Sequence, residues 1–86
     1  MDWQLIWAQR AIRDMRRLDC QVREHLLEAV ERFAATGAGD VIALDPPLGG
    51  YRLRYRDWRV SFDRDPESRT ITIRRVRRRD EAHKRD

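Results

Sequence analysis

Residues 51–60, with the sequence YRLRYRDWRV, alternate apolar and charged side chains on either side of a short polar break. Because successive side chains of a β-strand point to opposite faces of a sheet, this alternation predicts two strands, residues 50–56 and 58–64. Arg56 and Asp57 form the two-residue turn between them, although neither is a glycine. The stretch therefore predicts an antiparallel hairpin with one apolar face and one basic face.

The basic face of this hairpin brings like charges together. In the register that the turn sets, Arg54 lies directly opposite Arg59, and Arg52 lies on the same face. Like charges in directly opposite positions destabilise a sheet by a few tenths to ~1 kcal/mol. A bound polyanion would turn that repulsion into attraction, and phosphate is the obvious candidate. The alternative is that both guanidiniums extend into water or pair with Asp63 and Glu67 at little cost.

The segments that flank the hairpin predict further strands and one long loop. A third strand is expected over residues 69–77 after a turn at residues 65–68, and Arg75 breaks its alternation, which indicates a bulge. Residues 3–7 are short, apolar and partly aromatic, which is typical of a strand. Residues 40–50 contain a Pro-Pro and a Gly-Gly pair and are expected to form a loop.

Two stretches of apolar residues at helical spacing lie between the first strand and the loop. The first runs from Ala8 to Leu18, and the second begins after Asp19 as N-cap and stops at Gly37. Their short connection predicts an antiparallel helical hairpin. We therefore expect an α+β fold: a short N-terminal strand, this helical hairpin and a three-stranded antiparallel meander, with the helices on one face. The helices would cover Leu53, Val60, Phe62, Ile71 and Ile73. The open face would carry Arg52, Arg54, Arg59, Ser61, Thr72 and Arg74.

Length and composition limit the class of protein. Eighty-six residues, 41% hydrophobic and 40% charged, are expected to form one domain over residues 1–86 with one small core. A single cysteine allows no internal disulfide, and with two distant histidines it makes no zinc site, so neither a metal nor another cofactor is expected. No apolar run approaches membrane-spanning length, and the start of the chain lacks a leader pattern. The expected location is the reducing cytoplasm.

Positive charge is concentrated in the second half of the chain. Residues 1–48 carry six Arg and eight acidic residues, a balance of −2, whereas residues 49–86 carry thirteen basic and seven acidic residues, a balance of +6. Only one of the nineteen basic residues is Lys. A high-GC genome would explain the Arg-to-Lys ratio, but not its uneven placement. The basic half points to nucleic acid or to an acidic protein partner.

Other candidate residues are read in two ways. His83 is the imidazole of the basic half and could transfer a proton near neutral pH, or it is an exposed histidine of a polar tail. His25 and Cys20 belong to the second helix and are interpreted as structural. The tryptophans are interpreted as packing residues rather than base-stacking platforms; they are Trp3, Trp7 and Trp58.

The chain resembles the RelE/ParE superfamily of bacterial toxin–antitoxin toxins over nearly its whole length. The resemblance rests on the helix motif Ala-x-x-Asp-x-x-x-Leu-Asp at residues 11–19 and on Gly-Asp-Val-x-x-Leu at residues 39–44. It is most specific at residues 50–60, Gly-Tyr-Arg-Leu-Arg-x-x-Asp-Trp-Arg-Val. It ends with Val-x-x-Arg-x-x-Ala-His at residues 76–83, where the family commonly has His-Arg-x-x-x-Tyr.

The resemblance, to the RelE branch in particular, implies a ribosome-dependent mRNA endonuclease in which the ribose 2′-OH attacks the adjacent phosphate and the 5′-oxygen leaves. It implies that Arg59 and Arg79 stabilise the phosphorane charge. Arg52 and Arg54 would hold the phosphate backbone, and His83 would move the proton. Since arginine is a poor base, either this histidine serves as both acid and base, or water or the RNA supplies the second group. The catalytic residues are then Arg59, Arg79 and His83, and the residues that bind RNA or phosphate are Arg52, Arg54, Arg56, Arg74 and Arg78.

Two other functions share the same sequence features. A toxin of the ParE branch inhibits DNA gyrase without being an enzyme, and a toxin homologue without activity would only bind nucleic acid. If the protein is an mRNA endonuclease, its expected partners are a RelB-like antitoxin, the ribosome and mRNA, and no contact with a membrane is expected. The antitoxin is expected to be partly disordered and acidic, and to carry any contact of the complex with operator DNA.

Overall fold

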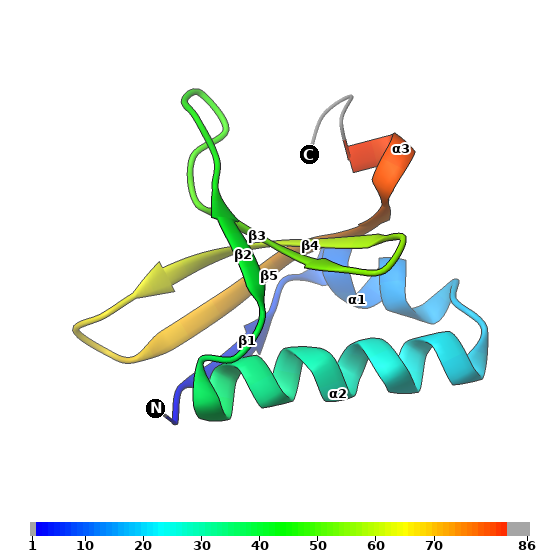
Figure 1. Cartoon of the computed structure of the whole chain (residues 1–86), viewed down its shortest axis with the longest axis horizontal. Helices are drawn as coiled ribbons and strands as arrows, with labels where there is room; N and C mark the ends of the chain where they lie inside the picture. The colour runs from blue at the N-terminus through cyan, green and yellow to red at the C-terminus, as the bar shows by residue number, and fades with distance from the viewer. Residues whose placement is uncertain (1, 83–86) are drawn as a thin grey trace.

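The computed structural model describes residues 2–82, which fold into one five-stranded sheet with the helices α1 and α2 on one face (Figure 1). The order of the strands across the sheet is β1-β5-β4-β3-β2. The helices α1 and α2 run in opposite directions below the sheet, so the predicted α+β fold is confirmed. The elements are β1 (Gln4–Trp7), α1 (Gln9–Arg16), α2 (Cys20–Thr36), β2 (Asp40–Ala43), β3 (Tyr51–Tyr55), β4 (Trp58–Asp65), β5 (Thr70–Arg78) and α3 (Arg79–Ala82).

The hairpin of β3 and β4 has the predicted register. Arg54 pairs with Arg59, and the neighbouring pair of Leu53 and Val60 is directed toward the helices and buried. The turn is formed by Arg56 and Asp57 as expected, and the φ of Arg56 is +54°. This left-handed conformation is unusual for a residue with a Cβ, and its position in a two-residue hairpin explains it.

The prediction of an uninterrupted loop over residues 40–50 was wrong, because its first four residues form β2. This strand pairs antiparallel with β3, placing Val41 opposite Leu53 and Ile42 opposite Arg52. Four residues are too short for an alternation signal, so the backbone pairing along the edge of β3 decides the conformation. The remaining loop is closed by the N–H of Leu44, which donates to the Gly50 carbonyl at 2.9 Å.

The meander is extended on its other side by a parallel strand, which makes the sheet mixed. β1 pairs with residues 70–73 of β5 and then ends. Beyond this point α1 lies along the free edge of β5, where a carboxylate oxygen of Asp14 accepts the N–H of Val76 at 2.9 Å. A bulge is present as expected near Arg75: the partners of consecutive residues of β4 jump from Arg75 to Ile73, which leaves Arg74 as the extra residue.

Helix α2 begins and ends where its sequence pattern predicts, whereas α1 ends at Arg16, two residues before the predicted end at Leu18. Asp19 accepts the N–H of Gln21 at 3.2 Å and caps α2, and Gly37, with φ +81°, ends it in the left-handed conformation. The ring of Phe33 packs against that of Phe62 with 5.3 Å between the centroids. All three tryptophans pack against this core. The inward residues of the sheet are buried as predicted: Leu53, Val60, Phe62, Ile71 and Ile73.

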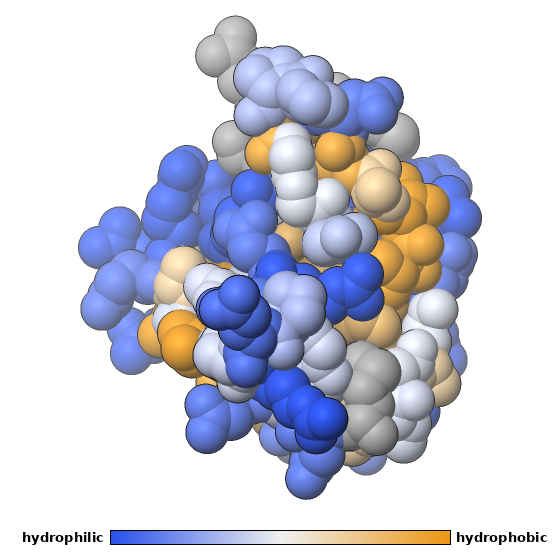
Figure 2. All heavy atoms as spheres, turned by 90° about the vertical axis from the view of Figure 1, so that its left-hand side faces the viewer, coloured by the Kyte–Doolittle hydropathy of each residue, from blue (hydrophilic) through white to orange (hydrophobic). Residues whose placement is uncertain are grey.

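The outer surface is strongly hydrophilic. Seen from the side where β4 turns into β5, most of the molecule's surface carries hydrophilic residues, with smaller hydrophobic areas between them (Figure 2). Within the described residues 2–82, no helix is long and apolar enough to cross a membrane.

Candidate nucleic-acid interface

Three arginines lie side by side across three adjacent strands. Arg54 of β3 is directly opposite Arg59 of β4, and Arg59 is directly opposite Arg77 of β5. Residues in directly opposite positions project from the same face of a sheet. That face is the one away from the helices, because the alternate residues Leu53 and Val60 are buried beneath it. We call Arg54, Arg59 and Arg77 the arginine row.

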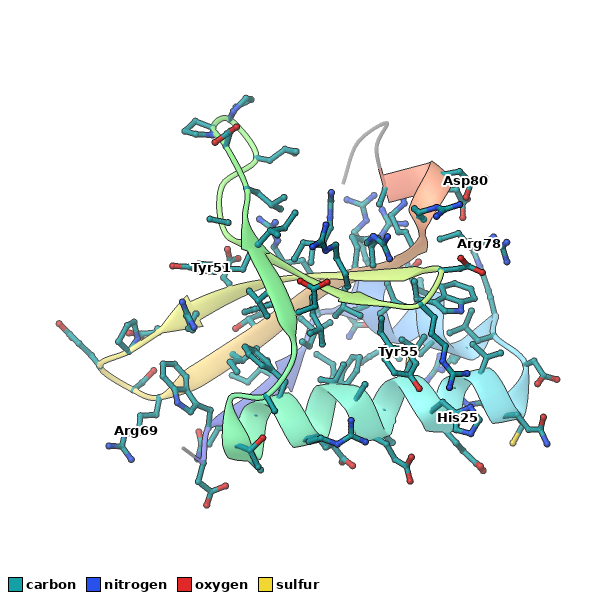
Figure 3. The ribbon with its side chains drawn as sticks, viewed as in Figure 1. His25, Tyr51, Tyr55, Arg69, Arg78 and Asp80 are labelled. Atoms are coloured by element: carbon teal, nitrogen blue, oxygen red, sulfur yellow. The ribbon has the colours of Figure 1, made fainter. Side chains whose placement is uncertain are left out.

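Nitrogen-bearing side chains gather on this open face, between the β2–β3 loop and α3 (Figure 3). At one end of the row, Arg54 donates two hydrogen bonds to Asp40, from Nε at 3.1 Å and from Nη2 at 3.0 Å. Both side chains are exposed, so this ion pair contributes little to stability. The pairing of Arg54 with Asp63 or Glu67, considered as an alternative from the sequence, is not found, since Arg54 pairs with Asp40.

Arg59 lies at the centre of the row, where neighbouring positive charges repel its guanidinium. Its Nη1 donates to the carbonyls of Arg56 at 2.8 Å and Trp58 at 2.7 Å, which ties the guanidinium to the hairpin turn. Burial, followed by the positive charges of Arg54, Arg79 and Arg52, lowers the pKa of Arg59, while Asp40 raises it. A bound anion would relieve this repulsion.

Arg79 of α3 and Arg52 of β3 lie next to the row, close enough for their charges to act on Arg59. The N–H of Arg79 donates to the Asp57 carbonyl at 2.8 Å, which fixes the start of α3 beside the hairpin turn. Arg52 was expected to be exposed on the open face, but only 7% of it is exposed. The reason is that α3 folds back over it, and its Nη2 donates to the carbonyl of Ala82 at 3.1 Å.

The other predicted RNA-binding arginines do not lie in the row. Arg56 lies over the ring of Tyr55 at 5.4 Å, and Arg78 lies over the ring of Trp58 at 5.7 Å. Arg74 donates to the carbonyl of Gly49 at 3.2 Å, in the β2–β3 loop. Their contact with RNA stays a prediction.

Sequence reasoning missed Arg77, although the signal was present. If the bulge before Arg75 is counted, Val76 points toward the helices and Arg77 toward the open face. His83, the predicted proton-transfer residue, lies outside the described residues, and its role also stays a prediction.

The central guanidiniums of this face have no anionic partner of their own. Within residues 2–82, no carboxylate lies within ion-pair distance of Arg59, Arg77 or Arg79. In the same part of the chain, no three His, Cys, Asp or Glu residues gather to hold a metal ion. The arrangement therefore suits a polyanion that is bound by fixed charges and hydrogen bonds.

The sequence of residues 5–83 matches the family described as ParE toxin of type II toxin-antitoxin system, parDE. The chain belongs to the RelE/ParE superfamily of toxins. A comparison with curated protein sequences finds no significant match.

Solved structures of RelE toxins share the fold of this toxin. The toxin–antitoxin complex RelBE2 of Mycobacterium tuberculosis matches with a TM-score of 0.76 and 23% identity, covering 92% of this chain and 100% of that chain. The RelE–RelB complex of Pyrococcus horikoshii matches with a TM-score of 0.76 and 21% identity over 92% and 97%. The isolated RelE toxin of E. coli matches with a TM-score of 0.67 and 22% identity over 95% and 96%. The family match thus bears the ParE name, whereas these structural relatives are RelE toxins.

Proposed function

We propose that this toxin is a ribosome-dependent mRNA endonuclease, an mRNA interferase that inhibits translation. The observation that carries the proposal is the arginine row beside Arg79 on the open sheet face. Among the described residues, no carboxylate pairs with Arg59, Arg77 or Arg79. Such a face binds a phosphodiester backbone, and its repulsion is relieved in proportion to the negative charge that it receives. A phosphorane carries more negative charge than the phosphodiester, so the same groups favour the transition state.

The proposed reaction is a transesterification within the RNA. The 2′-oxygen forms a bond to the adjacent phosphorus and gives up its proton, the bond from phosphorus to the 5′-oxygen breaks, and that oxygen receives a proton. Arg59 and Arg79 stabilise the phosphorane, and His83 is the proposed proton-transfer group. Arg54 and Arg77 hold the neighbouring backbone. Because Arg52 is buried against the carbonyl of Ala82, we assign it the role of positioning the end of α3.

The proposed regulator is a RelB-like antitoxin. Relatives from Mycobacterium tuberculosis, Pyrococcus horikoshii and E. coli have been solved in complexes with RelB. An acidic antitoxin segment would compete with RNA for the open face, because charge complementarity steers and orients both. Such a segment is disordered when free and folds as it binds the toxin. Removal of the antitoxin would therefore expose the open face again and release the toxin.

The second candidate function is inhibition of DNA gyrase without catalysis. The match to the ParE family supports it, since toxins of that branch act on gyrase. It differs from the first in requiring no proton-transfer group and no phosphorane contact at Arg59.

Translation of a defined mRNA in vitro separates the two functions. The wild type is compared with Arg59→Ala, with His83→Ala and with the control Arg32→Ala, which removes an exposed arginine of α2 and so matches the charge change. Primer extension is expected to find cuts in ribosome-bound mRNA with the wild type and the control, and not with the other two variants. Intact mRNA together with inhibited gyrase supercoiling would select the second function instead.

A further inference from the structure

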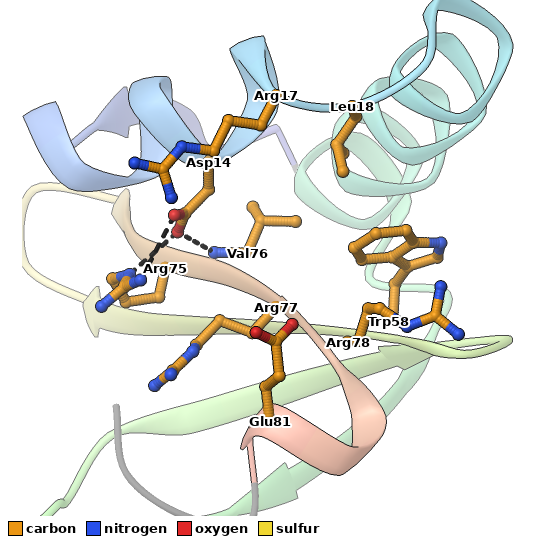
Figure 4. Close-up of a pocket in the computed structure, with 9 residues that line it drawn as sticks. All are labelled: Asp14, Arg17, Leu18, Trp58, Arg75, Val76, Arg77, Arg78 and Glu81. Carbon is orange, nitrogen blue, oxygen red and sulfur yellow. Dashed lines mark hydrogen bonds and ion pairs between the residues drawn. The ribbon is translucent and has the colours of Figure 1, made fainter.

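A basic concavity lies next to the arginine row, at the free edge of β5. It is a pocket of about 300 Å³ between the end of α1, the last residues of β5 and α3 (Figure 4). β1 has already ended here, so no strand covers this edge. We call it the edge pocket. Its volume is at the lower end of the range for small-ligand sites, about 300–1,000 Å³, and fits one nucleotide.

The free charge of the edge pocket is positive. The carboxylate of Asp14 is neutralised by Arg75, whose Nε donates to it at 2.8 Å (Figure 4). Three further arginines line the pocket, against a single further acid, Glu81. Within residues 2–82, neither Arg17 nor Arg77 has an ion-pair partner. The pocket therefore selects an anionic ligand.

One wall of the pocket offers a planar surface in addition to charge. Trp58 and Leu18 supply its apolar part. The guanidinium of Arg78 lies over the indole of Trp58, 5.7 Å from the ring centroid. Nucleobases stack on aromatic rings and on guanidinium planes alike, so the pair of Arg78 and Trp58 can hold the base of a nucleotide. An inorganic anion has no base and cannot use this surface.

Arg77 connects the two sites, since it belongs to the arginine row and also lines the edge pocket. We propose that the edge pocket is a nucleotide subsite. It holds one nucleotide of the RNA strand whose neighbouring phosphate lies on the arginine row. The base stacks on Arg78 above Trp58, and its phosphate is bound by Arg17 and Arg77. This inference rests on the proposed function, because it extends the path of the same RNA.

The test is an NMR titration of the full chain with adenosine 5′-monophosphate and, separately, with inorganic phosphate. The nucleotide is expected to shift the indole N–H signal of Trp58, and to leave those of Trp3 and Trp7 in place. It is also expected to bind more tightly than phosphate. Equal affinity of the two ligands, with no shift of the Trp58 signal, would overturn the subsite.

Variants separate the stacking surface from the charge. Arg78→Lys keeps the charge but loses the plane, so it is expected to weaken nucleotide binding about five- to a hundredfold while leaving phosphate binding unchanged. Arg17→Ala is expected to weaken the binding of both ligands. Arg13→Ala, which removes an exposed arginine of α1 outside the pocket, is expected to change neither. An effect of Arg13→Ala equal to that of Arg17→Ala would contradict the proposal.

A 2′-deoxy dinucleotide with a 5′-phosphate tests the connection to the row without any cleavage. It should bind more tightly than the mononucleotide, and Arg59→Ala should remove this gain. If the mononucleotide binds at Trp58 while mRNA stays intact during translation, the subsite stands and the proposed endonuclease fails. If mRNA is cut in an Arg59-dependent way and neither nucleotide shifts the Trp58 signal, the endonuclease stands and the subsite is wrong.

Discussion

Replacement of Asp14 by asparagine tests how the strand that carries Arg77 is held in place. The carboxylate of Asp14 is 9% exposed and accepts three hydrogen bonds at the free edge of β5. Two come from Arg75, at 2.8 and 3.3 Å, and one comes from the N–H of Val76, at 2.9 Å. It therefore replaces the strand that is missing beyond the end of β1.

The cost of Asp14→Asn follows from this geometry. Removing one partner of a buried ion pair costs about 3–5 kcal/mol, because the remaining charge is left uncompensated. Here the side chain of Arg75 is 17% exposed and can gain some hydration, and the amide oxygen of asparagine can still accept the N–H of Val76. We therefore expect a loss of about 2–3 kcal/mol, or at least about 8 °C in Tm for a domain of this size.

The matched control is Asp40→Asn, which breaks the bidentate pair between Asp40 of β2 and Arg54 of β3. Asp40 and Arg54 are 59% and 43% exposed, so the expected cost is below about 1 kcal/mol. Both variants are unfolded with urea and followed by circular dichroism, and the midpoints and slopes are compared with those of the wild type. If Asp14→Asn lowers the free energy of unfolding no more than Asp40→Asn does, the proposed role of Asp14 in holding the edge of β5 in place is refuted.

Three further predictions follow from the arginine row and the β2–β3 loop. Arg59→Ala is expected to slow mRNA cleavage about 10²–10³-fold, as measured in single-turnover cleavage. It is expected to change the free energy of unfolding, measured with urea, by less than about 1 kcal/mol, because the lost hydrogen bonds and the relieved repulsion offset each other. Arg77→Ala should lower the slope of log affinity against log salt for single-stranded RNA by about 0.7, as measured by fluorescence anisotropy, while Arg32→Ala leaves the slope unchanged. Gly50→Ala should cost at least about 1 kcal/mol more than Gly49→Ala in thermal unfolding, because a Cβ at Gly50 would lie 2.8 Å from the backbone carbonyl oxygen of Phe62 whereas one at Gly49 meets nothing within 4 Å.

The sequence predicts most of the fold because its local signals agree with one another. The alternation over residues 51–60 sets the register of β3 and β4, and Asp19 and Gly37 mark the ends of α2. Strand β2 was missed because four residues carry too little pattern, and its conformation depends on pairing with β3. The parallel pairing of β1 with β5 is likewise a tertiary contact that no local pattern encodes.

Only part of the candidate site could be predicted from the sequence, because the rest depends on tertiary contacts. Parity along a strand places Arg54 opposite Arg59, and counting parity past the bulge would have added Arg77. Parity cannot show that α3 folds back over Arg52, since that depends on a contact with the carbonyl of Ala82 thirty residues away. Nor does it distinguish the arginines of the open face from Arg78, which lies over the ring of Trp58 on the other face.

The chemical ends of the mRNA fragments test the proposed endonuclease most directly. A ribosome programmed with a short labelled mRNA is incubated with the toxin, and the ends of both fragments are identified by mass spectrometry. Attack by the 2′-oxygen predicts a 2′,3′-cyclic phosphate on the upstream fragment and a free 5′-hydroxyl on the downstream fragment, with no cleavage when the 2′-OH at the cut is replaced by hydrogen. An mRNA that remains intact on the ribosome, or one cut to leave a 5′-phosphate, would contradict the account.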